Sequence, residues 1–172
     1  MDFYSLARKR YSCRSLSGEA IEPEKIERII ETGLMAPTAC NNQPFKLWTI
    51  TSPEAVEKIA SCMRTTWGAK TFIVVGADSE HAWNRPSDDY NFADVDASIV
   101  ATHIMMQIEE EGLATTWVGH FKVGELKEAF PSMKPYNLIA IFPIGYSTQD
   151  DASAPGPRHF ERKDTDEMVI EL

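Results

Sequence analysis

FADVDASIVATHIMMQIEEE, residues 92–111, is the longest helical stretch that this sequence predicts. Apolar side chains occupy nearly the whole of its middle, from Ala97 to Ile108. A helix that is apolar almost all round must be buried on several sides. Asp94 and Asp96 suit the positive end of the helix dipole, and Gly112 suits its termination. We therefore expect a long helix covered by its own sheet, with a second subunit as a further possible cover.

Shorter helices and strands flank this segment. Helices are expected at residues 2–9, from Pro23 to a left-handed cap at Gly33, from the cap Ser52 to Met63, and at 123–130. Strands are expected at 45–51, 71–77, 114–118 and 138–146. Helices and strands do not alternate strictly, which favours an α+β fold. We expect a mixed, mostly antiparallel central sheet flanked by helices, with a polar, proline-rich C-terminal extension. Residues 1–172 are predicted to form a single domain.

Composition narrows the classes of partner. The formal net charge of −9 repels phosphate backbones and anionic lipid, so no nucleic acid and no membrane is expected as a partner. No apolar run approaches the roughly 18 to 20 residues that span a bilayer, and the N-terminal charges follow an apolar patch, which predicts a cytoplasmic protein. Three scattered cysteines and four scattered histidines predict reduced thiols and no metal site.

One segment is basic although the chain as a whole is acidic: Arg10-Tyr11-Ser12-Cys13-Arg14. In an extended chain Arg10, Ser12 and Arg14 would point to the same side and face one ligand. Guanidinium groups match phosphate oxygens in pairs, which indicates an anion site. The alternative is that these cations only complement the end of the preceding helix. The segment alone is too short to decide.

A second polar segment, Ala36-Pro37-Thr38-Ala39-Cys40-Asn41-Asn42-Gln43-Pro44-Phe45, places amides and a hydroxyl between two prolines. Stiff donors and acceptors suit the edge of a planar heteroaromatic ring. An ordinary turn, in which asparagine side chains cap their own backbone, fits the residues equally well. Cys40 is interpreted as a packing residue because no histidine is tied to it.

Taken in order, these segments resemble the nitroreductase family. An R-x-S-x-R element is followed by A-P-[ST]-x-x-N-x-Q-P-[FW], then by EEGLATTWVG at residues 110–119 and IFPIGY at 141–146. Arg162-Lys163 before Glu167-Met168-Val169 resembles the family's tail. The collinear match spans nearly the whole chain.

The resemblance implies a homodimer with FMN held at the subunit interface, reduced by NADH or NADPH as a transient donor. Hydride would pass through flavin N5 to a nitroaromatic, a quinone or a similar conjugated acceptor in a ping-pong cycle, so no catalytic side chain is required. The family's cofactor-binding positions correspond to Arg10, Tyr11, Ser12 and Arg14, to Pro37, Thr38, Ala39, Asn41 and Gln43 from the other subunit, to Val118 and Gly119, whose backbone N–H groups approach N5, and to Arg162.

Two departures from the family pattern weaken the substrate inference. Phe160 stands where some relatives have lysine, and the chain lacks the helical insertions that cover the substrate in longer members; residues 78–91 read as an exposed loop. His120 is expected at the surface or beside the pocket, and Trp117 in the core. A flavin carrier without turnover, and a small anion-binding module built on Arg10 to Arg14, remain the alternative hypotheses.

Overall fold

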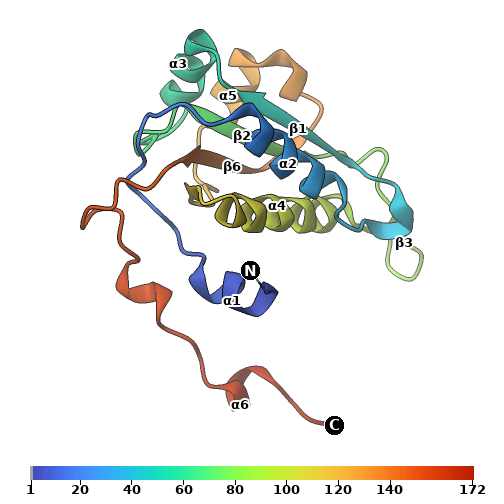
Figure 1. Cartoon of the computed structure of the whole chain (residues 1–172). Helices are drawn as coiled ribbons and strands as arrows, with labels where there is room; N and C mark the ends of the chain where they lie inside the picture. The colour runs from blue at the N-terminus through green and yellow to red at the C-terminus, as the bar shows by residue number, and fades with distance from the viewer. Residues whose placement is uncertain (1) are drawn as a thin grey trace.

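A four-stranded sheet forms the centre of the computed structural model, which describes residues 2–172 (Figure 1). Its strands are β1 (Phe45–Ile50), β2 (Thr71–Ala77), β5 (Ala114–Thr115) and β6 (Asn137–Gly145), in the spatial order β1-β2-β6-β5. Every pair of neighbouring strands is antiparallel. The expected α+β class is confirmed, and the sheet is antiparallel at each pairing.

Helices cover both faces of this sheet (Figure 1). Helices α2 (Pro23–Leu34) and α4 (Ala93–Glu110) lie on one face, and α3 (Pro53–Ser61) and α5 (Val123–Ala129) on the other. Helix α1 (Phe3–Lys9) packs beside α4, and α6 (Thr165–Met168) lies on the exposed C-terminal extension. Short 3-10 turns occur at Ala39–Asn41, Pro131–Met133 and Pro157–His159. The long helix α4 packs on β2, β6 and α2. As predicted, Ser52 caps α3, because its hydroxyl oxygen accepts the N–H of Ala55.

The buried strand β2 shows why two cores share one sheet. Successive side chains of a strand point to opposite faces. Phe72 and Val74 enter one core, whereas Ile73 and Val75 enter the core under α2 and α4. All four are fully buried, so this strand is covered on both faces as the run TFIVVGA predicts.

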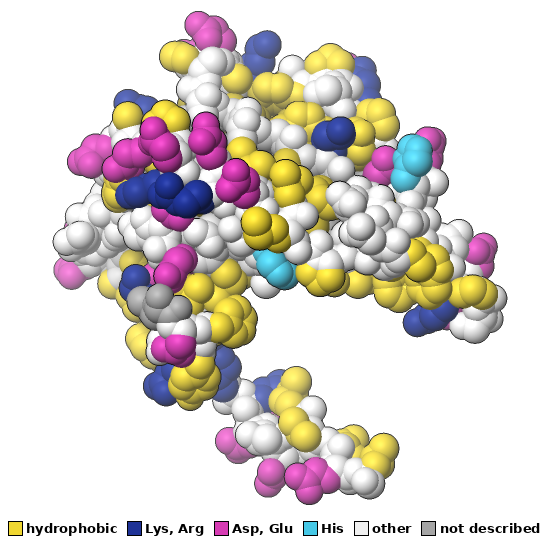
Figure 2. Space-filling view, turned by 45° about the vertical axis from the view of Figure 1, so that its right-hand side comes forward, with side chains coloured by type: hydrophobic (Ala, Val, Ile, Leu, Met, Phe, Trp, Pro, Cys, Tyr) yellow, Lys and Arg dark blue, Asp and Glu magenta, His cyan; other side chains and the backbone are white. Residues whose placement is uncertain are grey.

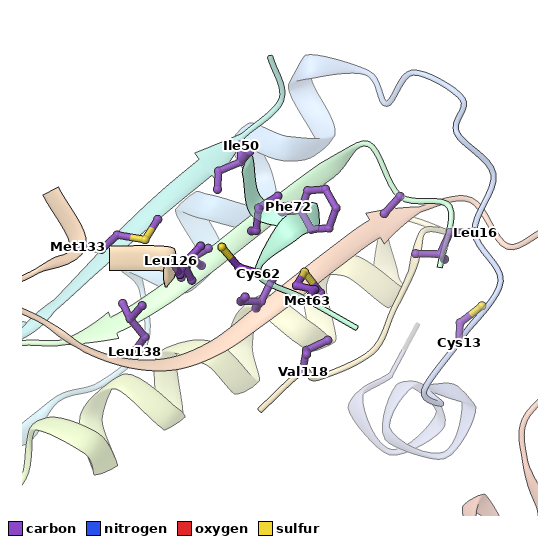
Figure 3. Close-up of a cluster of buried hydrophobic side chains, with 14 of the residues drawn as sticks. Cys13, Leu16, Ile50, Cys62, Met63, Phe72, Val118, Leu126, Met133 and Leu138 are labelled. Atoms are coloured by element: carbon purple, nitrogen blue, oxygen red, sulfur yellow. The ribbon is translucent and has the colours of Figure 1, made fainter. Parts of the chain in front are cut away.

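The core on the α3 and α5 side collects residues from distant parts of the chain (Figure 3). Cys62 and Met63 follow α3, and Leu126 lies on α5. Leu16 extends this core toward the N-terminal segment, where Cys13 is also buried. The N-terminal segment is thereby anchored to the domain just where the arginines begin.

Gly33 does not end α2 in a left-handed cap, and that expectation is wrong. The helix continues to Leu34, and its C-cap Met35 is right-handed, with φ −80°. Gly33 is instead buried against α4, where a Cβ atom would lie 2.8 Å from Cγ1 of Ile104. Glycine is needed here because the two helices approach closely. Gly112, by contrast, has φ +72° and ends α4 as predicted.

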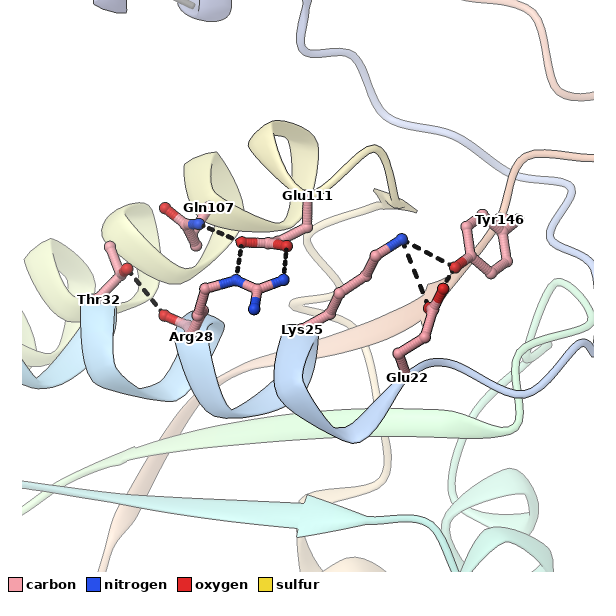
Figure 4. Close-up of polar contacts among 7 residues, drawn as sticks. All are labelled: Glu22, Lys25, Arg28, Thr32, Gln107, Glu111 and Tyr146. Carbon is pink, nitrogen blue, oxygen red and sulfur yellow. Dashed lines mark hydrogen bonds and ion pairs between the residues drawn. The ribbon is translucent and has the colours of Figure 1, made fainter.

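Polar contacts join α2 to α4 and to the end of β6 (Figure 4). Arg28 and Glu111 form a bidentate ion pair, with an Nε–Oε1 distance of 2.9 Å and an Nη2–Oε2 distance of 2.6 Å. Lys25 donates to the Tyr146 hydroxyl at 2.9 Å, and that hydroxyl donates to Glu22. Together these bonds fix the helix pair against the sheet.

Residues 78–91, expected as an exposed loop, carry a small hairpin of β3 (Asn84–Arg85) and β4 (Tyr90–Asn91). Arg85 forms an ion pair with Asp88, and its guanidinium lies over the Tyr90 ring, 5.2 Å from the centroid. The Asn42 side chain donates to the His81 carbonyl oxygen, so the hairpin's base is tied to the loop before β1.

The C-terminal extension leaves the domain and projects away from it (Figures 1 and 2). Residues 160–172 are all exposed, and exposed apolar side chains lie along this arm: Phe160, Met168, Val169, Ile170 and Leu172. Helix α1 also exposes Phe3 and Tyr4. Within residues 2–172 no helix combines the length and apolar character needed to cross a membrane.

Candidate functional site

Four arginines line one pocket between the N-terminal segment and the C-terminal arm. The pocket has a volume of about 630 Å³, and its lining includes Arg10, Ser12, Arg14, Arg158 and Arg162. The first three alternate along an extended chain, and the structure brings them to the same side as that spacing predicts. Glu161 is the acidic residue of the lining, so the pocket carries net positive charge.

The intervening residues hold this segment in place. Cys13 is fully buried, and its N–H donates to the Thr115 carbonyl oxygen at 3.0 Å. Leu16 is also buried, and its N–H donates to the Trp67 carbonyl oxygen at 2.8 Å. Because Cys13 is anchored to the core, its neighbours Ser12 and Arg14 face outward into the pocket. The backbone, rather than long flexible side chains alone, sets the direction of the cations.

The arginines of this pocket lie close enough together that their positive charges repel one another. Burial lowers the pKa of the Arg10 guanidinium below its usual range, the charge of Glu109 opposes that change, and nearby Arg162 adds to it. Glu109 is itself buried at the end of α4 and pairs with Lys9 at 3.0 Å. An anion in the pocket would relieve the repulsion between the arginines and replace the water that they lose.

A second, smaller pocket shares one residue of its lining with the first. It has a volume of about 240 Å³, and Arg14 lines both pockets. Its other residues are Arg64, Trp67, Thr116, Trp117, Val118, Gly119 and His120. Trp117 packs edge-on against Phe142 of the core, as expected, and also lines this pocket. His120 is exposed and lines the same pocket.

The backbone N–H groups of Val118 and Gly119 differ in availability. The Val118 N–H already donates to the Ile141 carbonyl oxygen at 3.0 Å, in an isolated bridge beside β6. Val118 lines this pocket, but its N–H is therefore already bonded within the chain. No residue in the described part of the chain accepts the Gly119 N–H, and no atom lies within 4 Å of the position that a Cβ would take there. Gly119 is the open donor of this turn.

Tyr11 and Arg162 both contact His159 of the short turn Pro157–His159. The Tyr11 ring packs edge-on against His159, with centroids 6.2 Å apart, and burial raises its pKa. Tyr11 is not part of the pocket lining. Arg162 lines the pocket, and its Nη1 donates to the carbonyl oxygens of His159 and Glu161 at 2.7 and 2.6 Å.

The loop at residues 37–43 does not line the arginine pocket of its own chain. Its predicted site residues are Pro37, Thr38, Ala39, Asn41 and Gln43. The Thr38 hydroxyl oxygen accepts the Gln43 N–H at 3.0 Å, and Asp96 accepts the Ala39 N–H at 3.0 Å. Asn41 is exposed. If these residues serve the arginine pocket, they must serve that of another subunit.

Backbone strain is concentrated in this loop. Cys40, Asn41 and Gln43 have φ values of 52°, 55° and 52°. A left-handed backbone costs an ordinary residue roughly 1–2 kcal/mol, although asparagine tolerates it. Strain of this kind persists only where surrounding bonds enforce it, and it is common at ligand sites. Cys40 is exposed, so the interpretation of it as a packing residue is wrong.

Some pocket residues could not be found from the sequence. Arg158 and His159 come from a tail with no recognisable motif, and Arg64 follows α3 without a partner motif. The basic residues at 158–163, within a polar tail of an acidic chain, are the signal that could have found the first pair. Among the described side chains no group of three His, Cys, Asp or Glu is arranged to hold a metal ion.

Comparisons with known proteins agree on the family. The sequence model described as the nitroreductase family matches residues 7–67 and 61–146. The crystal structure of a nitroreductase family protein from Clostridium difficile is similar, with a TM-score of 0.89 and 34% identity over 99% of this chain and 98% of that one. A protein of Exiguobacterium sibiricum, provisionally called a nitroreductase and crystallised in complex with FMN, has a TM-score of 0.84 and 19% identity, covering 100% and 98% of the two chains.

A curated relative from Archaeoglobus fulgidus, provisionally named NADH dehydrogenase/NAD(P)H nitroreductase, is 26% identical over 146 residues, 80% of each chain. The family model spans most of the chain, and the Clostridium difficile structure is similar along almost its full length. The collinear motifs and the antiparallel fold agree with both. This chain belongs to the nitroreductase family.

Proposed function

We propose that the protein is an FMN-dependent oxidoreductase that takes hydride from NADH or NADPH and delivers it to a nitroaromatic, a quinone or a similar conjugated acceptor. The observation that carries this proposal is the pair of adjoining pockets that share Arg14. One is rich in guanidinium groups, and the other presents the open N–H of Gly119. A ligand made of a phosphate joined to a polar ring system matches both pockets: the phosphate suits the guanidinium groups, and the ring edge suits the open N–H.

The donor set fits a phosphate monoester. Arg10, Arg14, Arg158 and Arg162 supply forked donors, and Ser12 supplies a hydroxyl. Each hydrogen bond to a charged phosphate contributes about 1.5 to 3 kcal/mol. The solved relative from Exiguobacterium sibiricum holds FMN within the same fold, which supports the choice of this nucleotide. We therefore assign the phosphate to the larger pocket.

In the smaller pocket the chain's own groups would orient a flat ring. The Gly119 N–H would donate to the ring edge, and Trp67 and the exposed His120 would border it. When bound, FMN supplies a ring nitrogen, N5, that accepts hydride and returns it to an acceptor. The residues would bind, orient and shield, which is why no nucleophile or catalytic triad is needed. Donor and acceptor would take turns at one exposed ring face, in a ping-pong cycle.

A homodimer would complete the site. The loop at 37–43 lies away from the pocket of its own chain, and its Asn41 side chain is exposed. The C-terminal arm exposes Met168, Val169 and Ile170 (Figure 2), which a lone chain leaves in water at a hydrophobic cost. We propose that both meet a second copy, the loop at its flavin and the arm on its surface.

The nicotinamide donor would visit the ring only briefly. The sequence has no G-x-G-x-x-G motif, so no dedicated dinucleotide domain is proposed. The Archaeoglobus fulgidus relative's name supports NADH or NADPH as donor. Three free cysteines, two of them buried, suit the reducing cytoplasm, which we propose as the compartment.

The test is to purify the protein, measure bound FMN by its visible absorbance, and add NADH or NADPH without oxygen. We expect a yellow protein that is bleached and then restored by a quinone or nitroaromatic. Arg10→Ala with Arg14→Ala should remove the FMN, whereas Lys58→Ala, an exposed lysine on α3, should not. A wild-type protein that fails to bind added FMN would refute the proposal. Bound FMN that neither nicotinamide reduces would favour a flavin carrier instead.

A further inference from the structure

Asp96 is a buried carboxylate on the first turns of α4, and its bonding is incomplete. Its side chain is 1% exposed. Oδ1 accepts the Ala39 N–H at 3.0 Å, but no group within the described chain donates to Oδ2. Ser17 Oγ is the other buried side-chain oxygen without a partner in residues 2–172. Burying a carboxylate oxygen without a hydrogen bond costs more free energy than burying a hydroxyl oxygen without one.

A carboxylate in this position does little for the stability of the chain alone. Removing a charge from water is unfavourable unless hydrogen bonds replace its hydration, and here one oxygen lacks such a bond. The positive end of the α4 dipole offsets part of this cost. Asp94, two residues earlier at the same helix end, is exposed and accepts two bonds from Asn137. The helix end therefore already has an acidic residue that needs no burial.

The one hydrogen bond that the Asp96 side chain accepts comes from the strained loop. Ala39 begins the 3-10 turn Ala39–Asn41, directly before the left-handed residues Cys40 and Asn41. The other hydrogen bonds of this turn join loop residues to one another or, through Asn42, to the hairpin base at His81. The bond from Ala39 to Asp96 is thus the loop's anchor on the long helix.

We propose that Asp96 is a positioning residue for the cofactor site: it acts through the Ala39 N–H to hold the 38–43 loop in its strained form, ready for the FMN of a second subunit. The inference rests on the proposed function. The chain keeps a buried carboxylate with one unbonded oxygen because this carboxylate favours ligand binding, although it does not favour folding.

The hydrogen bond predicts opposite effects on ligand affinity and on the stability of the empty protein. In Asp96→Ala the loop loses its anchor, and a buried charge is removed at the same time. We expect at least a tenfold loss of FMN affinity, with a thermal midpoint of the apoprotein equal to or above that of the wild type. Asp96→Asn keeps an oxygen for the Ala39 N–H, so it should bind FMN more tightly than Asp96→Ala. Asp94→Ala is the matched control and should bind like the wild type.

FMN affinity is measured by quenching of flavin fluorescence in the full-length dimer, the thermal midpoint on the apoprotein, and the ring environment by visible circular dichroism of the bound flavin. Wild-type affinity in Asp96→Ala would overturn the inference. So would a midpoint that falls together with affinity, an unfolded Asp96→Ala protein, or equal affinities of the Asn and Ala variants, since each points to a structural or purely electrostatic role. A wild-type protein without FMN affinity would refute the proposed function itself, whereas these outcomes refute only the role of Asp96.

Discussion

Gly33 of α2 faces Ile104 of α4 so closely that a Cβ on the glycine would lie 2.8 Å from Cγ1 of the isoleucine. Ile104 is fully buried and cannot move aside without disturbing the core under the sheet. The contact sets the spacing of the helix pair, and through it the position of the loop that follows α2.

Gly33→Ala should therefore destabilise the protein, although alanine is the better helix former. Overpacking costs about 1–3 kcal/mol, and the gain in helix propensity offsets about 1 kcal/mol. We expect a net loss of up to about 2 kcal/mol in the free energy of unfolding, measured by urea denaturation. Gly124→Ala in α5 is the control, since no atom lies within 4 Å of its Cβ position. Equal effects of the two variants would contradict the close approach.

The ion pair between Arg28 and Glu111 should make stability depend on pH (Figure 4). The hydrogen bond from Arg28 holds the pKa of Glu111 below its usual range, and a bond from Gln107 adds to this. A carboxylate with a depressed folded pKa stabilises fully above its unfolded pKa, about 4.3, and loses that effect as pH falls through the folded pKa.

Arg28→Met should therefore be less stable than the wild type at pH 7, and the difference should shrink toward pH 3. Urea midpoints at pH 7, 5 and 3 give the comparison. Lys58→Met removes an exposed positive charge that makes no ion pair with a described residue, and its effect should not vary in this way. A difference for Arg28→Met that stays constant with pH would show that the pair is energetically unimportant.

Gly119→Ala should separate folding from cofactor binding. A methyl group meets no atom of the chain within 4 Å, so the unfolding midpoint should remain that of the wild type. The same methyl stands at the edge of the smaller pocket, where it would hinder a ring that approaches the Gly119 N–H. We expect roughly a tenfold or greater loss of FMN affinity, about 1.4 kcal/mol, by fluorescence titration. Unchanged affinity would place the ring elsewhere.

Asn41→Asp should weaken FMN binding without unfolding the chain. The side chain is exposed, and aspartate also tolerates the left-handed backbone at φ 55°. A negative charge there would repel the polar oxygens of a flavin in the partner's site. Affinity and thermal midpoint are measured together, and sedimentation reports the oligomeric state. A stable monomer that keeps its flavin would contradict the shared site.

The exposed arm should hold the dimer together. Val169→Ser with Ile170→Ser removes two aliphatic side chains that are 54% and 83% exposed in the single chain. If a partner buries them, each is worth about 1.5 kcal/mol or more, and the two arms of the dimer together lose four such side chains, so the dimer should weaken roughly ten-thousandfold. Sedimentation over a range of concentrations measures this. Since neither side chain joins a core of its own chain, far-ultraviolet circular dichroism should not change.

Local patterns predicted much of this fold. Ser52 and Pro53 begin α3, TFIVVGA forms the doubly buried strand β2, and the apolar run around Val100 forms α4. The sequence also predicted that Arg10, Ser12 and Arg14 lie on the same side of the chain. They occupy alternate positions, and successive side chains of an extended chain point to opposite sides. These features depend on neighbours within a few residues, which the sequence displays directly.

Other features depend on what meets a residue in space. The sequence predicted a helix end at Gly33, but this glycine allows a close approach to Ile104, 71 positions further along the chain. The Val118 N–H reads as free but is taken by Ile141, and Arg158 joins Arg10 only because the chain's two ends converge. The periodicity of the helices and strands, and the caps at Ser52 and Gly112, depend on interactions between nearby residues and were determined by the sequence alone. The partners across the sheet, the helix spacing and the gathering of four guanidinium groups were decided by tertiary packing, since the identity of a distant neighbour leaves no mark on local pattern.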